Sequence, residues 1–336
     1  MSHGARRIQV LPLELRHPFV IAHGSSSVRE TVVLEVAGGA GEAATVPYLG
    51  ERTFDTLAAL EELAPHLESR IRAVEEIRVP PHVSSRAVAC AADMALFDGL
   101  GKALGRPLWD LVGAPEPLPF ETSLTIAMGT PDEMAARVRE MPATIYKVKV
   151  GGPHDEEALE AIRGVTNARI RLDANGGWSP ERAVEIIPRL ERFDIELVEQ
   201  PIATSDDASL GRLKGLGIGV PIFADESVAR LADVDRIASH VDGIVVKLRK
   251  CGGVRATVEV MQRARALGLR VMIGCMIESS LAVTAAAHLA GMCDLVDLDA
   301  PQLIRNDPYL GVTYQGSQCR VPSGAGIGAV RRDVQV

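Results

Sequence analysis

A repeated unit between residues 121 and 301 constrains the fold more than any other feature of this chain. Each unit is a short apolar run, a polar or charged residue at its C-terminal end, and then a segment with helical periodicity such as "PERAVEIIPRLE". The runs are "ETSLTIAM", "YKVKVG", "RIRLDANG", "IELVEQP", "PIFADES", "GIVVKLRK", "RVMIGCMIES" and "LVDLDAP". Apolar strands that alternate with helices predict a parallel sheet covered by helices, and eight runs favour a closed barrel over an open sheet.

The first third of the chain has a different, α+β pattern. We expect a strand at "RETVVLEV" (29–36), a turn at "GGAGE" (38–42), a helix over 53–69 and a long amphipathic helix over 85–104. The stretch "GRPLWDLVG" then ends that helix with glycine and proline. We therefore expect a separate domain that ends near residue 115.

Composition excludes several classes of function. The 36 lysines and arginines against 44 aspartates and glutamates give a net charge of −8, so the basic face that nucleic-acid binding requires is not expected. We find no apolar run of membrane-spanning length and no signal-peptide pattern at the N-terminus. Five widely spaced cysteines without a C-x-x-C pair indicate reduced thiols. We expect a cytoplasmic protein, and the sequence leaves open whether it forms a homo-oligomer.

Three carboxylates occupy the polar position that ends successive runs. Asp173, Glu199 and Asp225 lie 26 residues apart in each case, so one βα unit delivers one carboxylate to the same end of the barrel. Oxygen ligands without His or Cys suit Mg²⁺, with Mn²⁺ as an alternative. Each residue taken alone has a simpler alternative, which is to cap the following helix. The equal spacing of all three favours the metal site.

Lysines flank these carboxylates on both sides. Lys147 and Lys149 are two residues apart on one strand, so they share a face, and Lys247 belongs to the strand that follows Asp225. A solvated lysine pair on an edge strand is the alternative, which the apolar neighbours disfavour. Bases on two sides of a metal suit removal of the proton α to a carboxylate and its return from the opposite face. That chemistry is typical of a racemase or epimerase.

The motifs that carry these residues occur in a fixed order. They are "KVK" (147–149), "DAN" (173–175), "EQP" (199–201), "DES" (225–227) and "KLRKCGG" (247–253), with "ACAADMALFDGLGKALGRPL" upstream and "GAGIG" downstream. This series resembles the enolase superfamily, in particular its muconate lactonizing enzyme subgroup and the dipeptide epimerases of the L-Ala-D/L-Glu type. The resemblance implies an α/β fold: a modified TIM barrel, (β/α)7β, over 116–318, and an N-terminal α+β capping domain over 1–115 on which residues 319–336 pack back.

The resemblance also implies roles for individual residues. Mg²⁺ would be held by Asp173, Glu199 and Asp225, with Lys149 and Lys247 as the acid/base pair and Lys147 stabilising the enolate. Asn175 and Glu226 would support these groups from the "DAN" and "DES" motifs.

The substrate-binding candidates lie in three places. Asp297 and Asp299 in "LVDLDAP" resemble the site that holds the free α-amino group of a dipeptide, and the alternative is an ion pair with a local basic residue. Glu278 in "CMIESS" is a further polar candidate. The expected capping loops, 19–30 and 44–52, contribute Ser25, Arg29 and Tyr48.

We therefore predict an isomerase, a Mg²⁺-dependent epimerase that inverts the α-carbon of the C-terminal residue of an L,L-dipeptide. The alternatives are an N-acylamino acid racemase, an o-succinylbenzoate synthase or a muconate-type cycloisomerase of the same subgroup, or a barrel that binds ligand without catalysis. The first capping loop lacks an early arginine. That weighs against Ala-Glu as the substrate and leaves a small or apolar C-terminal residue at least as well supported.

Overall fold

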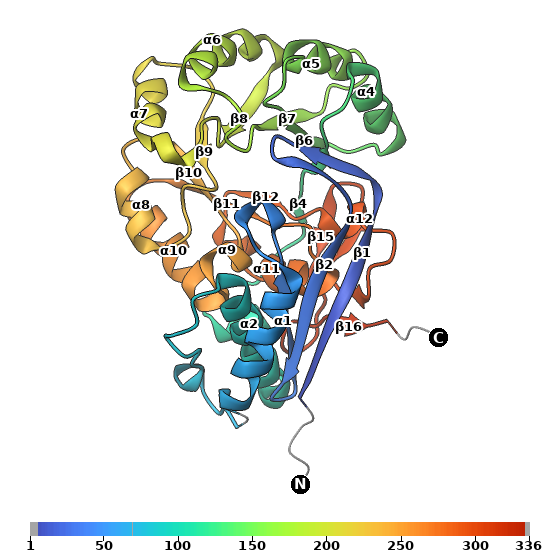
Figure 1. Cartoon of the computed structure of the whole chain (residues 1–336), viewed down its shortest axis with the longest axis vertical. Coiled ribbons are helices and arrows are strands. Elements are labelled where there is room, and N and C mark those ends of the chain that lie inside the picture. The colour runs from blue at the N-terminus through green and yellow to red at the C-terminus, as the bar shows by residue number, and fades with distance from the viewer. Residues whose placement is uncertain (1–5, 69, 333–336) are drawn as a thin grey trace.

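A computed structural model of the chain describes residues 6–68 and 70–332, apart from the side chain of Tyr48. Figure 1 shows two parts, a ring of parallel strands enclosed by helices and a smaller part built from an antiparallel sheet and the helices α1 and α2. The long β1–β2 hairpin extends from the smaller part to the barrel near β6. These observations confirm the predicted enolase-like α/β class.

The smaller part contains three antiparallel strands and three helices. They are β1 (Arg7–Ile21), β2 (Gly24–Val36), β3 (Gly39–Ala44), α1 (Thr53–Leu63), α2 (Arg86–Leu104) and α3 (Leu108–Leu111). Helix α2 begins where the Ser85 side chain accepts a hydrogen bond from the Val88 N–H, and it ends at Gly105, whose φ of 68° is left-handed. Most of α2 is buried against β3, so this helix is the core of the capping part.

The turn predicted at 38–42 lies at residues 37–38, where Gly38 has a left-handed φ of 81°, and β3 already begins at Gly39. Gly39 and Gly41 allow close packing of β3 on α2. A Cβ on Gly39 would lie 2.1 Å from the Ala95 carbonyl oxygen, and one on Gly41 would lie 2.0 Å from that of Ala91. The backbones of β3 and α2 therefore approach each other too closely for any side chain between them.

Two further boundaries differ from the prediction. Residues 19–30 are not a loop, since β1 and β2 form a paired hairpin that turns at 22–23. The helix expected over 53–69 ends at Leu63 and continues only as a 3-10 turn, Ala64–His66, because Pro65 cannot donate the next helical hydrogen bond.

Eight parallel strands form the barrel in chain order. They are β5 (Leu124–Ile126), β6 (Ile145–Lys149), β7 (Arg169–Asp173), β8 (Ile195–Glu199), β9 (Ile222–Ala224), β10 (Gly243–Val246), β11 (Arg270–Gly274) and β12 (Leu295–Asp297). Every predicted run overlaps one of these strands. The first and last strands meet through hydrogen bonds from Ser123 N–H to the Val296 carbonyl (3.4 Å) and from Leu298 N–H to Thr122 Oγ1 (2.6 Å).

Helices connect the strands and cover the outside of the barrel. They are α4 (Pro131–Glu140), α5 (Asp155–Arg163), α6 (Pro180–Leu190), α7 (Asp207–Gly215), α8 (Leu231–Ile237), α9 (Leu248–Cys251), α10 (Val254–Ala266), α11 (Ser280–Ala287) and α12 (Ala300–Leu303). The side chain of Ser179 caps α6 through the Arg182 N–H, and Thr130 with Glu133 forms a capping box on α4. These caps fix the residues at which α6 and α4 begin.

The interior of the barrel follows the two-residue period of its strands. Leu197, Phe223, Val245, Met272 and Leu295 form one buried cluster inside the ring, whereas their strand neighbours pack outward against the helices. Arg171 is 2% exposed and reaches across the interior to the Val296 carbonyl (2.8 Å). This packed layer closes the barrel below the site.

The C-terminal residues contact both parts of the molecule. Strand β16 (Val330–Arg331) pairs with β13 (Tyr309–Leu310), while the short strands β14 (Thr313–Gln315), β15 (Gln318–Arg320) and β4 (Phe120–Glu121) form a separate sheet. Arg331 bonds to Glu35 (3.2 Å) and Gln9 (2.5 Å) of the first two strands. We propose that the boundary between the capping domain and the barrel lies between residues 115 and 116.

All five cysteines are free thiols, and Cys90, Cys251 and Cys319 are buried. Among the residues the structure describes, no helix has both the length and the apolar character needed to span a bilayer.

Candidate active site

Strand register brings the predicted lysines and carboxylates to one level of the barrel. Lys149 on β6 lies beside Asp173 on β7, and Asp173 lies beside Glu199 on β8. Asp225 and Lys247 are the first residues after β9 and β10, at the same end of the barrel. Because side chains alternate along a strand, Lys147 and Lys149 both point inward, while Tyr146 and Val148 join the outer core.

Lys147 lies at the centre of the charged cluster. Its Nζ is 2.9 Å from Asp173 Oδ2, 2.9 Å from Glu199 Oε1 and 2.8 Å from Asp297 Oδ2. Burial alone would lower the pKa of Lys147, but the charges of Asp173, Asp297 and Glu199 outweigh it and raise that pKa well above the usual lysine value. This side chain therefore stays an ammonium group.

Lys149 is held by the strand beside it. Its Nζ donates to Asp173 Oδ2 (2.6 Å) and Asn175 Oδ1 (3.1 Å), and Asn175 in turn donates to Glu226 Oε1 (3.0 Å). Asn175 has a left-handed φ of 44°, and its N–H donates to Asp173 Oδ1 (2.9 Å). This backbone conformation turns the amide back toward Lys149. Asn175 thus contacts Lys149 directly, and Glu226 contacts Asn175.

Asp225 is the partner of Lys247 on the other side. Lys247 Nζ donates to Asp225 Oδ2 (2.7 Å), and Lys250 contacts Asp225 Oδ1 while also bonding to the Val245 carbonyl (2.8 Å). Burial tends to lower the pKa of Lys247, but Asp225 and other carboxylates raise it well above the usual value. The same lysines outweigh the effect of burial on Asp225 and hold its pKa below the usual range.

The cluster carries more negative than positive groups. Six carboxylates (Asp173, Glu199, Asp225, Glu226, Asp297 and Asp299) face four ammonium groups (Lys147, Lys149, Lys247 and Lys250). Burial, together with neighbouring carboxylates such as Asp173 and Asp225, raises the pKa of both Glu199 and Glu226. This group of side chains therefore contains more carboxylates than ammonium groups.

The residues present fit a divalent cation in chemistry and in charge. Within residues 6–68 and 70–332, no three His, Cys, Asp or Glu side chains converge in the manner of a metal site, and lysine ammonium groups pair with the predicted ligands. Glu199 Oε2 and Glu226 Oε2 are buried, and neither accepts a hydrogen bond from the described residues, although Glu199 Oε2 lies 2.9 Å from Lys147 Nζ as an ion pair. Buried carboxylate oxygens that accept no hydrogen bond, in a cluster with more carboxylates than ammonium groups, suit a hard cation such as Mg²⁺.

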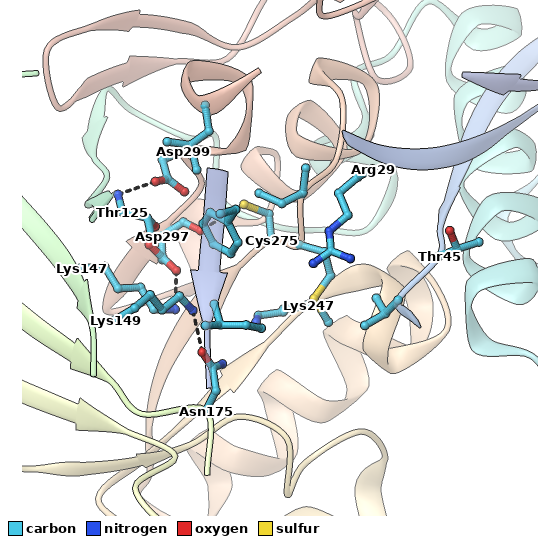
Figure 2. Close-up of a pocket in the computed structure, with 16 residues that line it drawn as sticks. Arg29, Thr45, Thr125, Lys147, Lys149, Asn175, Lys247, Cys275, Asp297 and Asp299 are labelled. Carbon is cyan, nitrogen blue, oxygen red and sulfur yellow. Dashed lines mark hydrogen bonds and ion pairs between the residues drawn. The ribbon is translucent and has the colours of Figure 1, made fainter. Parts of the chain in front are cut away.

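A pocket of about 70 Å³ opens above the lysines. Figure 2 shows Lys147 and Lys149 on one side and Lys247 facing them, with Asp297 and Asp299 at one end. Apolar side chains complete the lining: Phe19, Ile21, Val46, Met276, Ile277 and Leu303. The pocket thus places two amines and two carboxylates around one small, half-apolar space.

Asp297 and Asp299 both face this pocket, as predicted. Asp297 accepts hydrogen bonds from Ser123 Oγ (2.6 Å) and Lys147 Nζ (2.8 Å), whereas Asp299 Oδ2 accepts one from the Thr125 N–H (2.6 Å). Burial and the nearby charge of Asp297 raise the pKa of Asp299 to about 6. A cationic ligand group at this end would relieve that repulsion.

The other substrate-binding predictions have mixed outcomes. Arg29 lines the pocket, but Ser25 is exposed near the tip of the hairpin, paired with Val20, and lies outside the pocket lining. Glu278 also lies outside the lining, because its carboxylate is buried and accepts from the Met276 N–H (2.9 Å). The side chain of Tyr48 is outside the described part of the chain.

Several site residues were missed by sequence reasoning. Lys250 holds Asp225, and the amide oxygen of the buried Gln200 accepts hydrogen bonds from the Asp225 N–H (2.9 Å) and the Ser227 N–H (3.2 Å). Both belong to the motifs "KLRKCGG" and "EQP", so their position in the motif was the available signal. Ser123 directly precedes β5 and Thr125 lies within it, and no local pattern marks either residue.

Comparison with known proteins agrees with this geometry. Residues 130–333 match the family described as "Enolase C-terminal domain-like", and residues 5–113 match "Mandelate racemase / muconate lactonizing enzyme, N-terminal domain". The chain belongs to the enolase superfamily. The predicted family, and within it the mandelate racemase/muconate lactonizing enzyme group, is therefore confirmed.

Similar members of this superfamily include enzymes with known ligands. The L-Ala-D/L-Glu epimerase of Bacteroides thetaiotaomicron is 35% identical over 95% of this chain and 86% of its own. The substrate-liganded L-Ala-D/L-Glu epimerase of Bacillus subtilis superposes with a TM-score of 0.92 at 31% identity, covering 98% and 99% of the two chains. The dipeptide epimerase of Cytophaga hutchinsonii, complexed with Mg and D-Ala-L-Val, gives a TM-score of 0.90 at 27% identity and covers 98% and 96%.

Proposed function

We propose that this protein is a Mg²⁺-dependent dipeptide epimerase that inverts the α-carbon of the C-terminal residue. One observation carries the proposal: Lys149 and Lys247 face each other across a pocket whose end is formed by Asp297 and Asp299. Two opposed amines suit proton transfer on both faces of one carbon, and a carboxylate pair suits the free ammonium group of a dipeptide. Epimerases of this kind are among the similar proteins.

Asp173, Glu199 and Asp225 would hold the metal ion. When bound, the ion would supply positive charge that stabilises the carboxylate of the substrate as negative charge develops on it. Binding would also reduce the excess of negative charge in the cluster and weaken the lysine–carboxylate pairs seen here. Lys149 Nζ, now bonded to Asp173 and Asn175, would then be released toward the substrate.

The residues of this chain would perform the proton transfers. One of Lys149 and Lys247, as a neutral amine, removes the α-proton, and the other, as an ammonium group, donates a proton to the opposite face. Lys147, which remains charged among its carboxylates, would stabilise the developing enolate oxygen by a charge-assisted hydrogen bond. The apolar side chains Phe19, Ile277 and Leu303 would keep water from the reacting carbon.

The Asp297–Asp299 pair separates this function from its alternatives within the subgroup. A cycloisomerase substrate, or an N-acylamino acid with an uncharged side chain, carries no ammonium group, so two buried carboxylates at the pocket end would repel it. Dipeptides differ in this respect, because their α-amino group is cationic at neutral pH.

The test is incubation with Mg²⁺ and a library of L,L-dipeptides in D₂O. We expect one deuterium per turned-over substrate, at the α-carbon of the C-terminal residue, together with formation of the L,D epimer. N-acylamino acids and muconate serve as the comparison substrates. Turnover of those compounds without any exchange in the dipeptides would refute the proposal.

A further inference from the structure

Residues 44–51 of the capping part form a wall between two cavities. Thr45 and Val46 line the active-site pocket, whereas Leu49, Gly50 and Glu51 line a second cavity of about 620 Å³. Met276 lines both cavities, so the two spaces adjoin.

The second cavity lies behind the wall formed by residues 44–51. Its volume of about 620 Å³ provides space into which this wall can be displaced away from the active-site pocket.

One buried arginine of the barrel holds both ends of this wall. Arg249 is 3% exposed, and its Nε donates to the Ala44 carbonyl (3.1 Å) while its Nη2 pairs with the carboxylate of Glu51. The same Glu51 oxygen accepts a hydrogen bond from the Val46 N–H (2.9 Å). Arg249 follows Lys247 by two residues, so the wall is fixed directly to the segment that carries a proposed base.

We propose that Arg249 and Glu51 are specificity-determining positioning residues, which set the size of the C-terminal side chain that the pocket accepts. This proposal rests on the proposed function. A buried guanidinium holds its carboxylate firmly, because separating the pair would leave a buried charge without a partner. With the pair intact the wall stays against the pocket and favours a small C-terminal residue. Without it the wall can retreat into the second cavity and admit a large one.

The variants Arg249→Met and Glu51→Gln test the proposal. Each removes the ion pair with little change in side-chain volume. We expect the ratio of kcat/KM for L-Ala-L-Phe to that for L-Ala-L-Ala to rise by about tenfold or more in both, the scale on which a pocket discriminates side-chain size. Arg52→Met is the matched control, since it removes the adjacent but exposed Arg52–Asp55 pair, which does not reach the barrel.

Hydrogen exchange of the peptide 44–52 gives a second readout that is independent of turnover. We expect faster exchange in Arg249→Met and Glu51→Gln than in the wild type and in Arg52→Met. A kcat/KM ratio within twofold of the wild-type value would overturn the proposal, and so would unchanged exchange. If Arg249→Met does not fold, Glu51→Gln decides alone, because Glu51 is 25% exposed and the substitution is isosteric. A wild-type protein that turns over no dipeptide would instead refute the proposed function.

Discussion

Replacing Lys149 or Lys247 by methionine is the sharpest perturbation of the proposed proton transfer. Each carboxylate that loses a lysine keeps another: Asp173 retains Lys147 at 2.9 Å, and Asp225 retains Lys250. The penalty of roughly 3–5 kcal/mol for an unpaired buried charge is therefore avoided, and methionine preserves most of the packed stem. We expect both variants to fold with thermal midpoints near that of the wild type.

The effect on chemistry should be much larger than the effect on folding. A positioned general base contributes about 10²–10⁴-fold in rate, which corresponds to roughly 3–5 kcal/mol of barrier at about 1.4 kcal/mol per tenfold. Epimerisation needs both lysines, so it should fall by at least this factor in either variant. Exchange of the α-proton needs only the lysine that faces it, so each variant should still exchange one of the two epimers.

The assay follows deuterium incorporation into the L,L and L,D epimers separately, by ¹H NMR in D₂O with Mg²⁺. Lys149→Met and Lys247→Met should retain exchange in opposite epimers, because the two side chains face each other across the pocket. Exchange of the same epimer in both variants, or full epimerisation in either, would refute the assignment of one base to each face.

Three further predictions concern Asp299, the metal ion and Glu42, a buried residue of β3. Asp299→Asn should lower kcat/KM for a free dipeptide by roughly 10–100-fold, because a charge-assisted hydrogen bond contributes about 1.5–3 kcal/mol. The loss should be smaller for the N-acetyl derivative, which has no ammonium group. Equal losses in kcat/KM for the two substrates would contradict the role of Asp299. Mg²⁺ at 100 times its Kd should increase the free energy of unfolding of EDTA-treated protein by about 2.7 kcal/mol and so raise its thermal midpoint. K⁺ at equal ionic strength should leave the midpoint unchanged. Burial raises the pKa of Glu42 from 4.5 to about 7, so the folded protein binds a proton at Glu42 more tightly than the unfolded chain does. The contribution of this proton to the free energy of unfolding is complete below pH 4.5 and is lost as the pH rises through 7. Urea unfolding of the wild type and Glu42→Gln should therefore differ most above pH 7 in favour of the variant, and a pH-independent difference would contradict this reasoning.

The enolase-like barrel was predictable from local pattern because its strands are buried on both faces and separated by helices. The "KVK" motif shows this directly: its period of two fixes Lys147 and Lys149 on one face, and strand β6 confirms it. The glycines of "GGAGE" show the limit of the method. They read as a turn, but Gly39 and Gly41 serve the close approach of β3 to α2, a contact between residues 50 or more positions apart.

The sequence by itself determined which residues end the barrel strands, and hence that three carboxylates and three lysines would meet at one rim. Only the tertiary structure decided that Arg29 reaches the pocket while Ser25 and Glu278 do not, and that Arg249 holds the wall at residues 44–51. The physical reason is the range of the interactions. Periodicity along one strand sets the direction of a side chain, whereas its partners depend on how the capping part packs against the barrel, and no single segment of the sequence encodes that packing.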